Sequence, residues 1–174
     1  MAVFRLAHLS DLHLTGAAEE EALARSVFRS LRDYDVDHVV VTGDLSEHGE
    51  RSAFRMFDNA RRKFGYGPRR STVLIGNHDI RRRRAFASRF GGGAVTIREL
   101  DHGDLCLIGL DSAQVVTGFP SGAHDPKGYL DDDQLEELEQ ALRCQGSPQL
   151  IAPGSAKVIA ILGSSAWASL SASA

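Results

Sequence analysis

Three short segments of this chain carry side chains that could bind a metal ion. The segments "SDLHL", "TGD" and "GNHD" each follow directly after an apolar run. Together they supply six polar side chains: Asp11, His13, Asp44, Asn77, His78 and Asp79. Asp and Asn are common in turns, so one such segment would mean little. Three in succession indicate a shared site.

The types of these side chains limit the metal. Carboxylate, imidazole and amide oxygen together favour a borderline transition ion such as Mn, Fe or Zn over calcium. The ligands are too many for one tetrahedral zinc ion, but they suit two ions that share a bridging carboxylate. Such ions lie ~3.5–4 Å apart, where they activate a water and hold a phosphoryl group. Cys106 and Cys144 stand far apart, which excludes a sulfur-based zinc site.

The apolar runs and helical periodicity predict the elements that position these ligands. Strands are expected at 3–9, 38–42 and 71–75. The first helix is expected over 18–34, where apolar residues recur at helical spacing: Leu23, Val27, Phe28, Leu31 and Tyr34. A second helix is expected around Phe54, Phe57 and Phe64, and a third over 82–90. Such alternation favours a layered α/β fold with a parallel first half. Sites in these folds gather beyond the carboxyl ends of the strands, which is where the three segments lie. We expect Gly43 to permit a sharp turn before Asp44, and Gly76 to do the same before Asn77.

The pattern changes after the glycines at 91–93. Residues 94–100 and 105–111 predict two strands joined by a tight hairpin. Asp131 and Gln134 form a plausible cap for a helix that runs through Leu142. We expect Leu135, Leu138 and Leu142 of this helix to face inward, and residues 157–162 to form the last strand.

The segments "SDLHL", "TGDL" and "GNHD", in this order, resemble the calcineurin-like metallophosphoesterase family. They resemble particularly its cyclic-nucleotide-phosphodiesterase-like branch, in which an Arg closely follows "GNHD", here Arg81. The segment "GYLDDDQLEELEQAL" also resembles a later part of the family, and the resemblance covers residues 3 to about 162. It implies an α/β fold of the metallophosphoesterase type, a layered α/β/β/α sandwich.

The resemblance also implies a role for each ligand. Asp11 and His13 match ligands of the first metal, Asp44 matches the carboxylate that bridges both metals, and Asn77 matches a ligand of the second. The implied cofactors are therefore two divalent transition-metal ions, Mn, Fe or Zn. The implied enzyme is a hydrolase that cleaves a phosphoester, here a phosphodiester or cyclic nucleotide, by attack of a metal-bound hydroxide at a dinuclear centre.

Three further residues take roles near the reacting phosphate by the same resemblance. His78 matches the histidine that stabilises the phosphate and assists the leaving oxygen, and Asp79 matches the residue that orients it. A histidine held by a carboxylate can protonate a leaving alkoxide near neutral pH, which agrees with this role. A helix spreads Arg81 to Arg84 around its circumference, so we expect one of them, Arg81, to approach the substrate phosphate.

The family pattern continues with a strand that ends in histidines and with a later Gly-His-x-His motif. Here residues 157–162 are followed by Gly-Ser-Ser, and no histidine follows His124. We therefore expect an incomplete second metal site and a missing C-terminal part of the fold. The expected organisation is a metallophosphoesterase domain over residues 1–162 and a disordered tail or truncation product over 163–174. The alternative function is a truncated, catalytically impaired remnant that binds at most one metal or a partner. Completion of the site by His48 or His124 is a third hypothesis.

Charge and composition limit the partners. The net charge is −3 and the pI is about 6.1, yet ten of the twenty Lys and Arg residues lie between Arg61 and Arg89 against one acid, Asp79. This stretch either attracts a phosphate-bearing substrate or forms solvated helix faces. A small phosphoester is the favoured partner, because the low pI and the lack of interleaved aromatic residues argue against nucleic acid. No apolar run is long enough to cross a membrane, and two isolated cysteines suggest reduced thiols in the cytoplasm.

Overall fold

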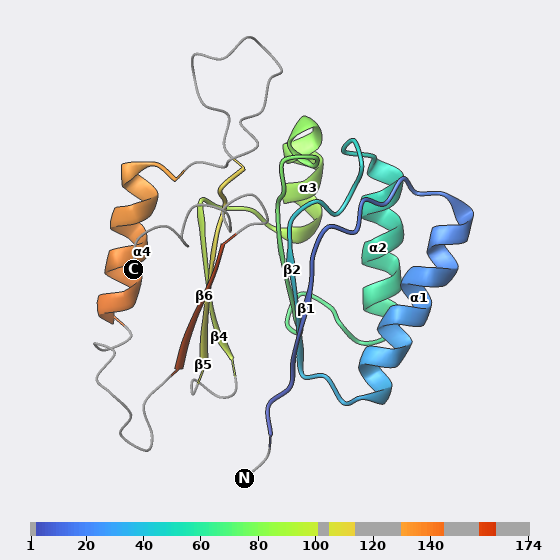
Figure 1. Ribbon diagram of the computed structural model, residues 1–174, viewed down its shortest axis with the longest axis horizontal. Coiled ribbons are helices and arrows are strands. Elements are labelled where there is room, and N and C mark those ends of the chain that lie inside the picture. The colour runs from blue at the N-terminus through green and yellow to red at the C-terminus, as the bar shows by residue number, and fades with distance from the viewer. Residues whose placement is uncertain (1–2, 101–104, 114–129, 145–156, 163–174) are drawn as a thin grey trace, which may run out of the picture. The chain divides into compact units, whose positions relative to one another are not determined.

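The structure of the chain is a computed structural model that describes residues 3–100, 105–113, 130–144 and 157–162 (Figure 1). The chain forms two compact units, Met1–Gly92 and Gly93–Ala174. The hairpin turn expected at 101–104, the tail expected at 163–174 and His124 lie outside the described residues.

A parallel three-stranded sheet forms the centre of the first unit. Its strands are β1 (Leu6–Leu9), β2 (His38–Thr42) and β3 (Ser71–Leu74), in the order β1-β2-β3. Its helices are α1 (Ala18–Asp33), α2 (Arg51–Lys63), the short 3-10 turn η1 (Ile80–Arg82) and α3 (Arg83–Phe90). Figure 1 shows α1 and α2 on the same side of this sheet. The parallel alternation predicted from the sequence is confirmed.

The core of the first unit lies between this sheet and its helices. Every residue of β2 is buried, as expected of a central parallel strand with both faces covered. Phe28 of α1 and Phe57 of α2 meet edge to face with ring centroids 5.3 Å apart. Two residues of the predicted apolar face of α1 are exposed instead, Leu23 by 64% and Tyr34 by 75%. Leu23 flanks the buried stripe, and Tyr34 lies at the C-cap, where the helix has ended.

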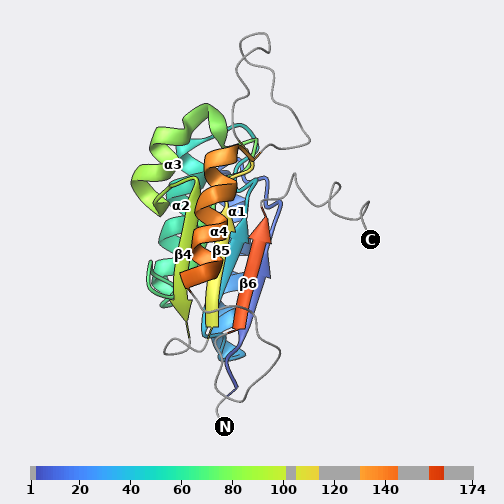
Figure 2. The same ribbon diagram turned by 90° about the vertical axis from the view of Figure 1, so that its left-hand side faces the viewer.

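The second unit contains a mixed sheet and one helix. Its strands are β4 (Val95–Leu100), β5 (Leu105–Leu110) and β6 (Lys157–Leu162), and its helix is α4 (Asp132–Cys144). The β4 and β5 strands pair antiparallel, whereas β5 and β6 pair parallel. Figure 2 shows α4 lying across one face of this sheet. The core of this unit joins Ala141 of α4 to Cys106, Ile108 and Leu110 of β5.

The start of α4 has the predicted cap. The backbone N–H of Gln134 donates to Asp131 Oδ1 at 2.8 Å, and the N–H of Asp131 donates to Gln134 Oε1 at 3.2 Å. Leu138 and Leu142 pack on the core as expected, but Leu135 is 46% exposed, so its predicted inward direction is wrong. Burial raises the pKa of the Cys106 thiol, which lies in the core of this unit. In the described part of the chain, no helix is long and apolar enough to span a membrane.

Candidate metal centre

The loops that follow β1 and β2 run side by side at the carboxyl edge of the first sheet. Leu9 of β1 pairs with Val41 of β2, so the two strands end almost level. The N–H of His13 then donates to the carbonyl of Asp44 at 2.9 Å, and the N–H of Leu14 donates to Leu45 at 3.0 Å. These backbone bonds bring the ligands predicted on the first two strands to one place.

Three of the predicted ligands have a left-handed backbone. The φ angle is 54° at Asp11, 46° at His13 and 47° at Asp44. Among the described residues, Asp35 is the other non-glycine residue with a positive φ. Residues other than glycine adopt this conformation at a cost in energy, and such residues cluster at functional sites. Gly43, with φ 92°, permits the turn before Asp44 as expected.

Asp11, His13 and Asp44 come together in the structure. Each offers one ligand atom, and these atoms lie within 4.8 Å of one another. Asp11 is exposed and accepts a hydrogen bond from the Ser10 hydroxyl, whereas Asp44 is only 6% exposed. Two carboxylates this close repel each other unless a cation lies between them. This donor set therefore fits a divalent metal ion.

The loop after β3 packs directly on the loop after β2. A Cβ atom added to Gly76 would lie 2.0 Å from the backbone nitrogen of Asp44 and 2.2 Å from its Oδ1. A turn begins at Gly76, as expected, because the N–H of Asp79 donates to the carbonyl of Gly76 at 3.2 Å, although the φ angle of this glycine is not positive. The lack of a side chain at Gly76 also leaves the space that Asp44 fills.

His78 and Asn77 reach the same edge through this loop. The backbone N–H of His78 donates to Asp44 Oδ1 at 3.0 Å, which fixes the carboxylate at the centre of the site. Asn77 lies between this bonded residue and Gly76, and it is partly buried. The structure thus places five of the six predicted ligand and catalytic residues, Asp11, His13, Asp44, Asn77 and His78, on adjacent loops.

Glu47 joins the two histidines, and the sequence reasoning missed it. His78 Nδ1 lies 2.6 Å from the carbonyl oxygen of Glu47, so this nitrogen must carry the hydrogen. The Glu47 carboxylate lies 2.9 Å from His13 Nδ1 and 4.0 Å from His78 Nδ1. The available signal was its place three residues after Asp44, in the same loop.

The carboxylate of Asp79 holds the loops together. It is fully buried and accepts hydrogen bonds from the N–H groups of Leu45, Ser46 and Gly76 and from the Ser46 hydroxyl. Burial raises the pKa of this carboxyl, and those hydrogen bonds oppose the shift. Asp79 was expected to orient His78, but Nδ1 of the His78 ring bonds to the carbonyl of Glu47. A catalytic role of Asp79 stays a prediction.

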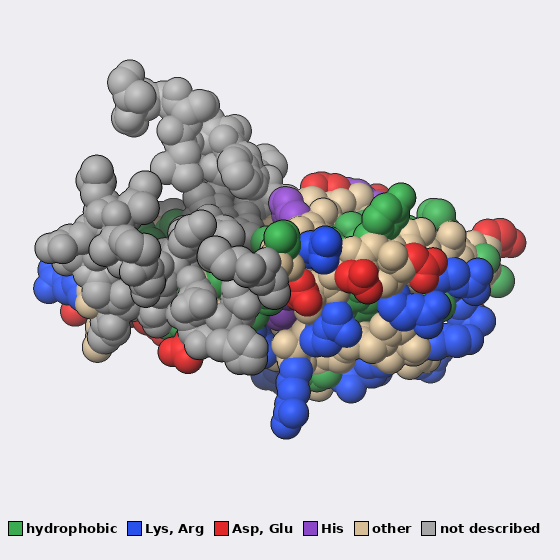
Figure 3. Space-filling view, turned by 90° about the horizontal axis from the view of Figure 1, so that it is seen from below, with side chains coloured by type: hydrophobic (Ala, Val, Ile, Leu, Met, Phe, Trp, Pro, Cys, Tyr) green, Lys and Arg blue, Asp and Glu red, His purple; other side chains and the backbone are tan. Residues whose placement is uncertain are grey.

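Part of the basic stretch has a structural role. Arg61 is buried, and its guanidinium forms an ion pair of 2.6 Å with the buried Asp58. The same carboxylate also binds Arg62 at 2.9 Å and Arg89 at 3.2 Å. Arg62, Lys63, Arg69, Arg70, Arg81, Arg82 and Arg84 are exposed, and Figure 3 shows Lys and Arg side chains with acidic ones between them on the face that it presents. The stretch is therefore divided between buried ion pairs and solvated helix faces.

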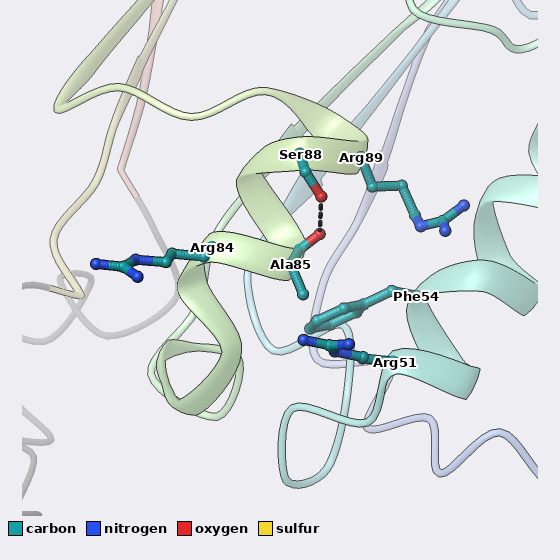
Figure 4. A pocket seen from close by; sticks show the side chains of 6 residues that line it. All are labelled: Arg51, Phe54, Arg84, Ala85, Ser88 and Arg89. Atoms are coloured by element: carbon teal, nitrogen blue, oxygen red, sulfur yellow. Dashed lines mark hydrogen bonds between the residues drawn. The ribbon is translucent and has the colours of Figure 1, made fainter.

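The arginines after "GNHD" do not share one direction. Arg81 and Arg82 lie against Gly49, where an added Cβ would be 3.4 Å and 3.2 Å from their side chains. A hollow of about 310 Å³ between α2 and α3 is lined by Arg51, Phe54, Arg84, Ala85, Ser88 and Arg89 (Figure 4). Arg84 and Arg89 extend to opposite sides of α3 in this view. The expectation that the four arginines cannot face one ligand agrees with this arrangement.

Comparison with known proteins identifies the class to which this fold and site belong. The chain resembles a crystal structure of a dimetal phosphatase from Danio rerio, with a TM-score of 0.67 and 14% identity. The match covers 92% of this chain and 69% of that one. It confirms the predicted mixed α/β fold of the metallophosphoesterase type.

Sequence comparison then gives the family. The profile of the calcineurin-like phosphoesterase family matches residues 4–154. The chain is also 32% identical over 145 residues to a probable cyclic nucleotide phosphodiesterase of Rhodopseudomonas palustris, a match that covers 77% of this chain. The chain spans about half the length of that curated relative, 50%. The protein belongs to the calcineurin-like phosphoesterase family, as the three sequence segments indicated.

Proposed function

We propose that this chain is a metal-dependent phosphoesterase that hydrolyses a phosphodiester or cyclic nucleotide. The observation that carries the proposal is the convergence of Asp11, His13 and Asp44, whose ligand atoms lie within 4.8 Å of one another. The name of the Rhodopseudomonas palustris relative supports the phosphodiester class. Family membership supports hydrolysis as the reaction.

The centre is proposed to hold two divalent ions of Mn, Fe or Zn. Asp11 and His13 would bind the first ion, Asp44 would bridge both, and Asn77 would bind the second. When bound, such ions activate a water molecule and balance the charge of the phosphoryl group. Among the described residues, the second ion has only Asp44 and Asn77 of the proposed set, so we expect it to bind more weakly than the first.

His78 is proposed to donate a proton to the leaving oxygen. The carbonyl of Glu47 accepts the hydrogen of its Nδ1 at 2.6 Å, which fixes the tautomer and leaves Nε2 as the nitrogen that exchanges a proton. The bond from the His78 backbone to Asp44 Oδ1 holds this ring next to the metal ligands. Arg81 is exposed near the same loops and is proposed to approach the substrate phosphate.

The alternative is an impaired remnant that binds at most one metal or a partner. Gly-Ser-Ser follows residues 157–162 at the place where the family pattern expects histidines, and this observation favours the alternative. A remnant of this kind would still bind an ion at Asp11, His13 and Asp44. The two functions therefore differ in turnover, and metal binding at these three residues is common to both.

A panel of esters tests the proposal. Bis(p-nitrophenyl) phosphate, p-nitrophenyl phosphate and cyclic AMP would be offered with and without Mn²⁺ to the unaltered chain and to His78→Ala. We expect slow, Mn²⁺-dependent hydrolysis of the diesters, reduced about 10²-fold or more in His78→Ala, because general acid catalysis contributes on that scale. Manganese binding without any turnover would support the remnant, and turnover that His78→Ala leaves intact would contradict the proposed role of His78.

A further inference from the structure

A second group of ligand atoms lies beside the first and shares one residue with it. His13, Glu47 and His78 each offer one ligand atom, and these atoms lie within 4.8 Å of one another. We propose that this group is a zinc site, an alternative position to the one formed by Asp11, His13 and Asp44. Zinc bound there removes His78 from proton transfer, a consequence that rests on the proposed function, whereas the binding itself does not.

The geometry of the group suits a single small cation. The rings of His13 and His78 have centroids 4.7 Å apart and stand almost perpendicular, at 87°. The Glu47 carboxylate lies 2.9 Å from His13 Nδ1 and 4.0 Å from His78 Nδ1. Because His78 Nδ1 carries a hydrogen, Nε2 of this ring would be the zinc ligand. All three side chains are about one third exposed, so a hydrated ion can reach them.

His13 Nδ1 lies beside the Glu47 carboxylate but makes no hydrogen bond to the residues that the structure describes. This atom is buried, and a Glu47 oxygen lies 2.9 Å away. Buried polar atoms are nearly always satisfied, so an unsatisfied one needs an explanation. A metal ion held between His13 and Glu47 would satisfy it.

The chemistry of the donors selects zinc for this group. Two imidazoles and one carboxylate, with a fourth position open to water, are a common donor set of catalytic zinc. The other group has two carboxylates and one imidazole, and oxygen-rich sites suit manganese better. Because His13 belongs to both groups, one ion occupies one position or the other. The identity of the metal would therefore decide whether His78 stays available.

Separate calorimetric titrations with Zn²⁺ and with Mn²⁺ test this proposal. The proteins, stripped of metal, are the unaltered chain, Glu47→Gln and Asp11→Asn. Glu19→Gln is the matched control, since Glu19 is an exposed carboxylate of α1 outside the group. We expect Glu47→Gln to weaken zinc binding at least about tenfold more than manganese binding, because Glu47 would bind zinc directly but would only contact His13, a ligand of manganese. Asp11→Asn should show the opposite pattern.

The proposal is overturned if Glu47→Gln binds zinc as the unaltered chain does, which would leave the contact between His13 and Glu47 a plain ion pair. It is also overturned if Asp11→Asn weakens both metals equally, which would indicate one shared site. Glu47→Gln keeps the shape of the side chain, and far-ultraviolet circular dichroism checks that each variant is folded. Both titrations are independent of turnover, so a chain that hydrolyses no ester can still pass or fail them.

The behaviour of His78 gives a second readout. The imidazole proton signals of His78, assigned by comparison with His78→Ala, should shift on addition of Zn²⁺ to Asp11→Asn. They should not shift when Zn²⁺ is added to Glu47→Gln at the same concentration. Signals of His78 that zinc does not move in Asp11→Asn would contradict the proposal even if zinc binds elsewhere.

Discussion

Gly76 and Asp44 are in direct contact, so that a Cβ atom at position 76 would lie 2.0 Å from the nitrogen of Asp44. This contact seats the loop after β3 on the loop after β2. It also brings the backbone of His78 within 3.0 Å of Asp44 Oδ1. The position of the proposed bridging carboxylate thus depends on a residue that has no side chain.

Gly76→Ala is expected to damage both stability and the metal centre. The added methyl group meets backbone, which cannot move aside cheaply, so we expect a loss of about 1–3 kcal/mol in the free energy of unfolding. Urea unfolding and manganese titration measure the two effects. Gly67→Ala is the matched control, because a Cβ there meets nothing within 4 Å. Equal behaviour of the two variants would show that the contact is unimportant.

Asp79→Asn is expected to lower stability before it affects any chemical step. An amide has one acceptor oxygen, whereas the carboxylate of Asp79 accepts bonds at both oxygens from Leu45, Ser46 and Gly76. We expect a loss of about 1–3 kcal/mol in the free energy of unfolding, the range for buried polar groups left unsatisfied. Chemical denaturation measures it. A variant of unchanged stability and abolished turnover would instead support the catalytic role expected from the sequence.

Glu20 should make the stability depend on pH. Partial burial acts to raise the pKa of its carboxyl, but hydrogen bonds from Gly16, Thr15 and Ala17 outweigh burial and lower it. A lowered pKa in the folded state contributes stability above the pKa of the unfolded chain, and this is lost as the pH falls through the folded value.

The variant Glu20→Gln is therefore expected to lose about 1 kcal/mol of stability at neutral pH, as other helix caps do. The difference from the unaltered chain should shrink as the pH falls through the carboxyl range. Denaturant unfolding at several pH values measures it. Glu19→Gln, in the same first turn of α1, is the control and should show a smaller effect. A Glu20→Gln difference that grows on acidification would refute the assignment.

Arg61 is expected to matter more for folding than its neighbour. Replacing Arg61 by Met leaves the buried Asp58 with weaker partners, and breaking a buried ion pair costs about 3–5 kcal/mol. Arg62→Met removes an exposed partner of the same oxygen and should cost about 1 kcal/mol or less. The free energies of unfolding in urea compare the two. Similar losses in the two variants would mean that the burial of Arg61 does not increase its contribution to the free energy of unfolding.

The sequence predicted the first unit well because its elements follow local rules. The valine-rich strand β2 lies in the chain between two amphipathic helices, α1 and α2. In the second unit, the Asp131–Gln134 cap of α4 formed as its spacing required. The family segments also carry Asp11, His13 and Asp44, whose ligand atoms lie within 4.8 Å of one another.

What the sequence did not predict depends on contacts between loops. Gly76 is needed because it lies so close to Asp44 that no side chain fits there. Glu47 contacts the site because its loop turns back toward His13 and His78. Neither relation has a periodic signal in the chain. The predicted burial of Leu135 and Leu23 was wrong for a related reason. Helical spacing does not determine which flank of an apolar stripe is covered by other elements.

Manganese binding by equilibrium dialysis tests the central claim most directly, namely that loops from three strands build one metal centre. The unaltered chain would be compared with Asp44→Asn, and with Asp33→Asn as an exposed control from the end of α1. We predict that the unaltered chain and Asp33→Asn retain manganese at fewer than two ions per chain, and that Asp44→Asn binds it at least about tenfold more weakly. Manganese retained equally by Asp44→Asn and the unaltered chain would contradict the claim.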